Sequence, residues 1–232
     1  LYPGPLPGRL NIGLLHTSLT GREGHDPYAP TSVEALCDKG YDYFALGHVH
    51  AREVVRSSDP RIVFPGNLQG RHAKETGPKG CELVTVEGGV ITAAEFVSLE
   101  VVRWHQFRLD ASGLSSVDAL ARHFVGQARE LVADARDRLH AVRLLIHGES
   151  VLHRLEAEQP GSIAAAIQAA TQDLEDADLW IEQVRLDLQS PLDRTAAAGR
   201  ADAVGEVVRL VDALGTDQGQ LKAWFAQQVA EM

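Results

Sequence analysis

The chain has 232 residues, with 22 Lys and Arg against 32 Asp and Glu, which gives a net charge of −10. At about 150 residues per domain, this length allows one large or two small domains, and the 44% of apolar residues can fill a sizeable core. This composition excludes a disordered, collagen-like or coiled-coil protein. No apolar run reaches roughly 18 residues and the start lacks signal-peptide features, so we expect no membrane association and a cytoplasmic location.

Cys37 and Cys81 are the two cysteines of the chain. They are too few for a disulfide framework and lack a metal-ligand spacing, so we expect free thiols in a reducing compartment. The net negative charge argues against a protein that binds nucleic acid by bulk electrostatics. Binding to nucleic acid would therefore have to be local or assisted by a metal.

Short apolar runs, broken by Gly, Pro and Asp, dominate residues 11–100 and predict strands. The expected strands lie at 12–15, 43–46, 54–55, 62–64, 83–86 and 90–97, with one helix at 32–39. This pattern is typical of a layered α/β or sandwich domain. The Pro-rich opening before Asn11 reads as a connecting loop, and we expect the chain to be a piece of a longer protein.

After about residue 100, Arg replaces Lys and helical periodicity appears, so we expect a domain boundary near residues 98–102. An amphipathic helix is predicted through residues 117–132, where Ser115 and Asp118 resemble a capping box. The expected strands lie at 102–109, 141–147 and 179–188, with shorter helices at 150–158 and 162–174. Residues 101–190 are therefore predicted to form a small α+β module.

Two closing helices are expected at 195–214 and 217–231, separated by Gly215. Each carries an apolar stripe, and these comprise Val204, Val207, Val208, Val211 and Leu214, then Leu221, Trp224, Phe225 and Val229. The two stripes either bury each other as a helical hairpin over residues 191–232 or form a partner-binding surface, and both readings stay open.

Histidines follow two of the predicted strands. His48 and His50 come directly after an apolar strand and Gly47, and His16 ends the strand that begins near Asn11. Residues two apart on an extended backbone project to the same side, so His48 and His50 can converge on one metal or on two adjacent metals. Each histidine alone could equally be an ordinary strand-end or core residue. Their combination at one sheet edge favours a metal site.

Four segments together resemble the calcineurin-like metallophosphoesterases, and more closely the YhaO-type branch of SbcD-like DNA repair exonucleases. The segments are His16-Thr-Ser-Leu, Tyr41-Asp-Tyr-Phe-Ala-Leu-Gly-His48-Val-His50, Phe64-Pro-Gly-Asn67-Leu-Gln-Gly-Arg71-His72 and Gly77-Pro-Lys79-Gly80-Cys. The resemblance covers nearly the whole chain and is most specific over residues 3–100. It implies that the chain begins with the C-terminal half of a four-layer metallophosphoesterase β-sandwich and continues with a capping domain and a helical hairpin. The fold class of the whole chain would then be α+β.

The resemblance also implies roles for individual residues. His16 and His48 correspond to ligands of the second metal and His50 to a ligand of the first, in a site that normally holds two Mn²⁺ ions. Such a pair of metals clamps a phosphodiester and activates the attacking water. Asn67, Arg71, His72 and Lys79 are the candidate substrate-binding residues. For the loop around Arg71, Lys74 and Lys79, a solvated turn is an equally open reading.

The family's Asp-x-His, Gly-Asp and Gly-Asn-His-Asp motifs do not occur in the 232 residues. Without these carboxylates we expect the isolated chain to hydrolyse DNA weakly or not at all. By position along the chain, residues 104–188 are similar to the family's capping domain, and the closing helices to the segment that docks on an SMC-like ATPase.

Three functions follow from these observations. The first is a metal-dependent DNA exonuclease subunit that binds DNA and an SMC-like ATPase and that can form a homodimer. The second is a small-molecule phosphodiesterase that uses the same metal site. The third is a non-catalytic module that binds an ATPase through its terminal helices.

Overall fold

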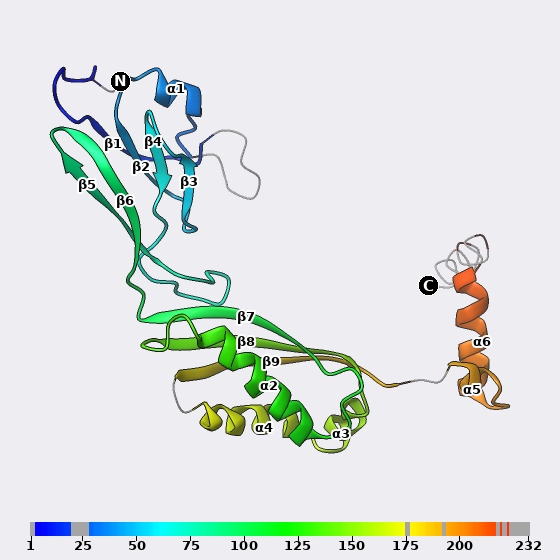
Figure 1. Ribbon diagram of the computed structural model, residues 1–232. Coiled ribbons are helices and arrows are strands. Elements are labelled where there is room, and N and C mark those ends of the chain that lie inside the picture. The colour runs from blue at the N-terminus through cyan, green and yellow to red at the C-terminus, as the bar shows by residue number, and fades with distance from the viewer. Residues whose placement is uncertain are drawn as a thin grey trace.

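The computed structural model describes residues 3–19, 28–174, 177–191 and 194–216, together with residues 219 and 222. The described residues form a four-stranded, a two-stranded and a three-stranded sheet with helices between them (Figure 1). The protein is therefore of mixed α+β class, as expected. No helix in the described ranges is long and apolar enough to cross a membrane.

The four-stranded sheet carries the predicted histidines. It contains β1 (Ile12–His16), β2 (Tyr43–Gly47), β3 (Glu53–Arg56) and β4 (Arg61–Phe64) in the order β1-β2-β4-β3. β1, β2 and β4 are mutually parallel, and β3 pairs with β4 antiparallel. The short helix α1 (Val33–Cys37) is capped by Ser32, whose side chain accepts the N–H of Ala35. Its residue Leu36 lies in one core cluster with Phe44, Leu46, Ile62 and Phe64.

A long hairpin of β5 (Gly80–Glu87) and β6 (Val90–Ser98) follows the sheet. Gly88 and Gly89 make its turn, both with positive φ, which glycine adopts at little cost. Glu82 on β5 is buried between Arg52 and Arg61 and forms ion pairs with both. Burial raises the pKa of Glu82, but the hydrogen bonds from the two guanidinium groups outweigh this and lower it. This carboxylate fixes the hairpin to the four-stranded sheet.

The middle unit, residues 102–189, is a parallel three-stranded sheet covered by helices on one face (Figure 1). Its strands β7 (Val102–Asp110), β8 (Leu139–Glu149) and β9 (Asp178–Gln189) stand in chain order. The helices are α2 (Val117–Val132), α3 (Leu152–Glu158) and α4 (Ser162–Ala170), the last followed by a 3₁₀ turn, η1 (Thr171–Asp173). Phe124 of α2, Leu144 of β8 and Ile167 of α4 are fully buried in its core.

The start of α2 differs from the prediction. Ser116, not Ser115, is the N-cap, and its hydroxyl accepts the N–H of Ala119 at 3.2 Å. Adjacent serines offer two alternative caps, and the register of the apolar stripe decides between them. Leu120, Phe124 and Ala128 must face the sheet, which places the first helical turn at Val117.

The helix expected over residues 195–214 is divided into α5 (Arg194–Ala198) and α6 (Ala203–Thr216). Asp202 accepts the N–H of Gly205 and begins α6, while Arg209 donates to the carbonyls of Ala198 and Arg200 across the break. The two helices stand apart from the other elements in Figure 1. Val208 is buried, whereas Val207 is 57% exposed. The expected helix at 217–231, with Trp224 and Phe225, lies largely outside the described residues.

A buried carboxylate joins the middle unit to the strands before it. Glu100 is 2% exposed and accepts hydrogen bonds from Ser98 Oγ, Arg103 Nε and the N–H of Lys79. Arg138 forms a further ion pair with it at 3.3 Å. Burial raises the pKa of Glu100, but the hydrogen bonds from Ser98, Arg103 and Lys79 outweigh this and lower it. The joint is therefore a cluster of charged, hydrogen-bonded side chains around Glu100.

Candidate functional site

His16 and His48 meet at the carboxyl edge of the parallel strands. His16 is the last residue of β1 and pairs in register with Gly47, which ends β2. Because β1 and β2 are parallel, the residues that follow them emerge at the same edge of the sheet. The two imidazole rings lie 5.3 Å apart between centroids at an interplanar angle of 81°. We call this the histidine edge, and it confirms that these two side chains converge.

The backbone at Gly47 and His48 is shaped for this approach. A Cβ added at Gly47 would lie 2.9 Å from Nδ1 of His16, so any larger residue would push the His16 ring away. His48 has φ +95°, in the left-handed region that L-residues other than Asn and Asp rarely adopt. Strained backbone of this kind clusters at functional sites, where surrounding contacts hold it in place. Gly47 and His48 together aim the two rings at each other.

Tyr28 completes the aromatic group at this edge. Its ring packs edge-on against His16 at 5.1 Å and stacks on His48 at 5.7 Å. The turn after β1 holds it, because Ser18 Oγ accepts the N–H of Tyr28 and Thr17 Oγ1 donates to the carbonyl of Ala29. The sequence gives no periodic signal for Tyr28, which lies far from both histidines along the chain.

His50 is engaged by a carboxylate that the sequence reasoning missed. Its Nδ1 lies 2.6 Å from Oε1 of Glu75, and Oε2 of Glu75 accepts the N–H of Arg71 at 2.8 Å. Since an ionised carboxylate only accepts, we assign the His50 proton to Nδ1, which leaves Nε2 as the free nitrogen lone pair. A carboxylate that orients a histidine in this way is the usual second partner of a metal-ligating imidazole.

Glu75 is only 8% exposed, and its pKa is low despite this burial. Burial alone raises the pKa, but hydrogen bonds from the Arg71 N–H and His50, with the nearby His72 ring at 3.8 Å, lower it to about 2. Glu75 is therefore a carboxylate at any physiological pH. It ties the loop after β4 to His50.

Asn67 and Lys79 lie behind His50 instead of facing solvent. The backbone N–H of Asn67 and the Nζ of Lys79 both donate to the carbonyl of His50, each at 3.2 Å. The Lys79 side chain is buried, so the structure places it as a support of the His50 backbone and not in a solvent-facing phosphate clamp. Both polar side-chain atoms of Asn67 are buried without a hydrogen-bond partner among the described residues.

Arg71, His72 and Lys74 remain on the outside of the loop. Arg71 uses its backbone N–H to hold Glu75, while its side chain is exposed. His72 is 56% exposed in its side chain. These three side chains are therefore open to solvent, and the assignment of Arg71 and His72 to substrate binding stays a prediction.

The histidine edge fits part of a metal centre. Imidazole nitrogens are suitable donors for a divalent transition metal, and His16 and His48 bring two imidazoles together here. Within the described ranges, however, no three His, Cys, Asp or Glu side chains are grouped closely enough to hold an ion. The described residues therefore do not form a metal site by themselves, and the assignment of His16, His48 and His50 to metals stays a prediction.

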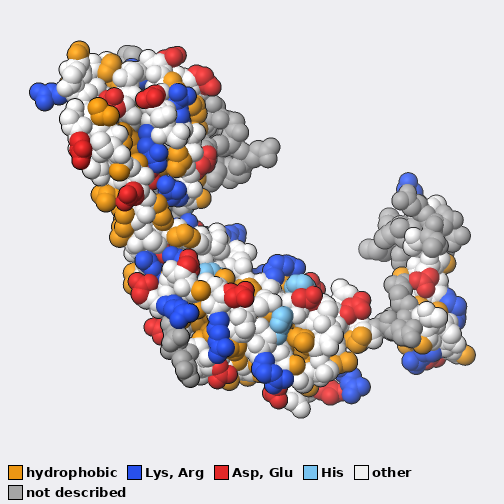
Figure 2. Space-filling view, viewed as in Figure 1, with side chains coloured by type: hydrophobic (Ala, Val, Ile, Leu, Met, Phe, Trp, Pro, Cys, Tyr) orange, Lys and Arg blue, Asp and Glu red, His pale blue; other side chains and the backbone are white. Residues whose placement is uncertain are grey.

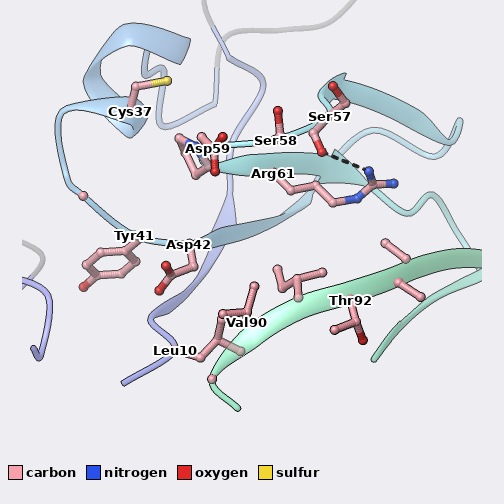
Figure 3. A pocket seen from close by; sticks show the side chains of 16 residues that line it. Leu10, Cys37, Tyr41, Asp42, Ser57, Ser58, Asp59, Arg61, Val90 and Thr92 are labelled. Carbon is pink, nitrogen blue, oxygen red and sulfur yellow. Dashed lines mark hydrogen bonds between the residues drawn. The ribbon is translucent and has the colours of Figure 1, made fainter. Parts of the chain in front are cut away.

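A cavity lies at the opposite end of the sheet from the histidine edge. It measures about 510 Å³ and lies between the starts of β2 and β4 and the strand β6 (Figure 3). Arg61 is turned to the carbonyl of Ser57, and Asp42 accepts the N–H of Asn11. These two side chains are therefore committed to the fold. Cys37, also in its lining, is a free thiol, as is Cys81.

Two comparisons with known proteins bear on this geometry. Residues 104–189, which are nearly the whole middle unit, match the family model described as the middle domain of metallophosphoesterase YhaO. Over 183 residues the chain is 35% identical to a protein of Bacillus subtilis (strain 168) named "Uncharacterized metallophosphoesterase YhaO". Both comparisons support a metallophosphoesterase family. The alignment covers 76% of this chain and 42% of the relative, so the chain spans less than half of that metallophosphoesterase.

Proposed function

We propose that this chain is part of a metal-dependent phosphodiesterase that acts as a DNA exonuclease in DNA repair. The observation that carries the proposal is the convergence of His16 and His48 at the carboxyl edge of two parallel strands. The relationship to metallophosphoesterases supports hydrolysis of a phosphoester. DNA as the substrate rests on the resemblance of the motifs around His48 and Asn67 to DNA repair exonucleases.

In this proposal the enzyme uses two Mn²⁺ ions, with His16, His48 and His50 as ligands and the carboxylate ligands supplied by residues outside the 232 of this sequence. Bound metals would neutralise charge on the phosphate and lower the pKa of a water. The chain's own residues hold the imidazoles in place: Gly47 makes room for His16, and Glu75 keeps the proton of His50 on Nδ1.

The test compares two proteins on DNA with Mn²⁺. The 232-residue chain is expected to show negligible hydrolysis, because its described residues do not group three ligands. The same chain extended by its upstream residues is expected to degrade DNA, and His48→Ala should reduce this rate by about 100-fold or more. His153→Ala, on the exposed side of α3, is the matched histidine control and should keep the rate.

The same assay separates the competing functions. Hydrolysis of a small phosphodiester without degradation of DNA would replace the nuclease by a small-molecule phosphodiesterase. An extended protein whose hydrolysis is unaffected by His48→Ala would contradict the site itself.

The exposed apolar side chains of α6 support a protein partner as part of this proposal. Val204, Val207 and Val211 recur at helical spacing, and each is about half exposed. We propose that this surface binds an SMC-like ATPase. We further propose that two copies of the nuclease form a homodimer. Co-purification of the ATPase with the complete protein, and its loss on Val207→Asp, would test this.

A further inference from the structure

One face of the sheet in the middle unit carries no helix. α2, α3 and α4 all lie on the same side of β7, β8 and β9, and the loop between β4 and β5 approaches from the other side (Figure 1). We call this second side the open face. In a domain of this size an uncovered sheet face is unusual, because most parallel sheets are covered on both sides.

Strand periodicity identifies the side chains of the open face. Phe107 and Leu109 of β7 pack into the core under α2, so the even-numbered residues of β7 point the other way. The strand register then gives four rows across the sheet. The rows are Trp104–Ala141–Trp180, Gln106–Arg143–Gln183, Arg108–Leu145–Arg185 and Asp110–His147–Asp187.

The first row is aromatic. The rings of Trp104 and Trp180 lie 6.4 Å apart at 66°. Trp104 is held in place by its Nε1–H, which donates to the carbonyl of Gly70 at 2.9 Å. Trp180 is 48% exposed and presents a free ring beside this fixed one. A large, half-exposed aromatic ring on a rigid strand is a stacking platform at low entropic cost.

Arginines follow in the next two rows. Arg143 is held by Glu182 through two hydrogen bonds, at 2.7 and 2.8 Å. Arg108 and Arg185 are exposed, and Arg185 Nε donates to Gln183 Oε1 at 3.2 Å. The hydrogen bond from Arg143 is the main cause of the lowered pKa of Glu182, and the charge of Arg185 contributes to it. The fourth row contains Asp110 and Asp187, so the arginine-bearing rows end there. Figure 2 shows basic and acidic side chains interspersed over the middle unit, so a ligand of these arginines must bind locally.

The open face is continuous with the basic loop near the histidine edge. Gln106 Nε2 donates to the carbonyl of Ala73 at 2.9 Å, which fastens the loop to β7. Arg71, His72 and Lys74 therefore border the aromatic row. We expect a strand bound on the open face to continue onto this loop.

We propose that the open face binds single-stranded DNA, with a base stacked on Trp180 and phosphates at Arg108 and Arg185. The proposal rests on the proposed function for DNA as the ligand. Proteins that bind single strands combine an exposed aromatic ring, on which an unstacked base can stack, with amide and arginine side chains that bind the base edge and the phosphates. Bases in a duplex are already stacked on each other and cannot reach Trp180.

The test is binding of a fluorescein-labelled oligothymidylate of about 15 nucleotides to the 232-residue chain in EDTA, followed by anisotropy. Trp180→Ala should weaken binding roughly tenfold or more, and Trp180→Phe should restore most of it. Arg185→Ala should weaken binding and reduce the dependence of log K on log salt by about 0.7, the value for one phosphate contact on a single strand. Arg154→Ala, on exposed α3, is the charge-matched control and should change neither quantity.

Equal affinity of the wild type and Trp180→Ala would overturn the proposal, as would a tenfold preference for a duplex or for oligouridylate of the same length. Because Trp180 is half exposed, its variants are expected to fold, and unchanged thermal unfolding checks this. EDTA excludes hydrolysis, so the result is independent of the metal site. Two outcomes separate the two proposals. If binding depends on Trp180 but the extended protein has no nuclease activity, only the proposed function fails. If the extended protein is an active nuclease but Trp180→Ala binds DNA normally, only the open-face proposal fails.

Discussion

Glu75 determines which nitrogen of His50 carries the proton. In Glu75→Gln the neutral amide holds the Nδ1–H less strongly and gives up the charge that the Arg71 N–H binds. We expect the His50 ring to populate both tautomers, visible as a change in its ¹⁵N shifts, and the free energy of unfolding to fall by about 1–3 kcal/mol. Glu87→Gln, at the exposed end of β5, is the matched control and should leave both unchanged.

His105 predicts a pH dependence of stability. Burial is the largest cause of a lowered pKa of His105, and together with the charges of His140 and Arg103, against the opposite effect of Asp134, it lowers the pKa from 6.5 to about 4. Its Nε2 lies 2.9 Å from Nδ1 of the fully buried His140, whose Nε2–H donates to the carbonyl of Ala135. Between pH 6.5 and 4 the unfolded chain therefore binds a proton that the folded chain refuses.

The expected result is a loss of roughly 1–3 kcal/mol of stability as the pH falls through this window, with full stability retained above pH 6.5. Urea unfolding at several pH values measures it. His105→Gln should flatten this part of the profile. A stability that rises on acidification from pH 6.5 to 4 would contradict the lowered pKa of His105.

At the scale of the element, the cap of α2 is testable because two serines are adjacent. Ser116→Ala removes the hydroxyl that accepts the Ala119 N–H and should cost about 1 kcal/mol of stability. Ser115→Ala should change stability by less than about 0.5 kcal/mol, as a surface substitution does. The reverse ranking in thermal or urea unfolding would return the cap to Ser115.

The strands and α2 follow from the sequence because burial of one face imposes a period of two or 3.6 residues. The break between α5 and α6 could not be predicted from the sequence, because the apolar pattern continues through it. The side chain of Asp202 determines where the second helix begins. The convergence of His16 and His48 was predictable from two parallel strand ends. Glu75 and Tyr28 were not, because they lie in loops and are placed by tertiary contacts alone.

For the whole molecule, β1 is an edge strand with an apolar outer face. Leu14 is 74% exposed, and the β5–β6 hairpin leaves an apolar cleft of about 250 Å³ beside it, lined in part by Tyr43 and Val84. Such edges promote association between chains. We expect the isolated chain to self-associate in sedimentation velocity as its concentration rises, and Leu14→Lys to suppress this. Val101→Lys, equally exposed but outside the strands, is the control and should not.

The buried carboxylate of Glu100 connects the two parts of the molecule that carry the proposed sites. Its hydrogen bonds to Lys79, Ser98 and Arg103 join the middle unit to the end of the loop that carries Glu75. If the open face holds a DNA strand and the histidine edge hydrolyses it, as proposed above, this joint sets the spacing between the two sites, and the released fragments should share a narrow range of sizes. Glu100→Gln should loosen the joint and broaden that range on a sequencing gel.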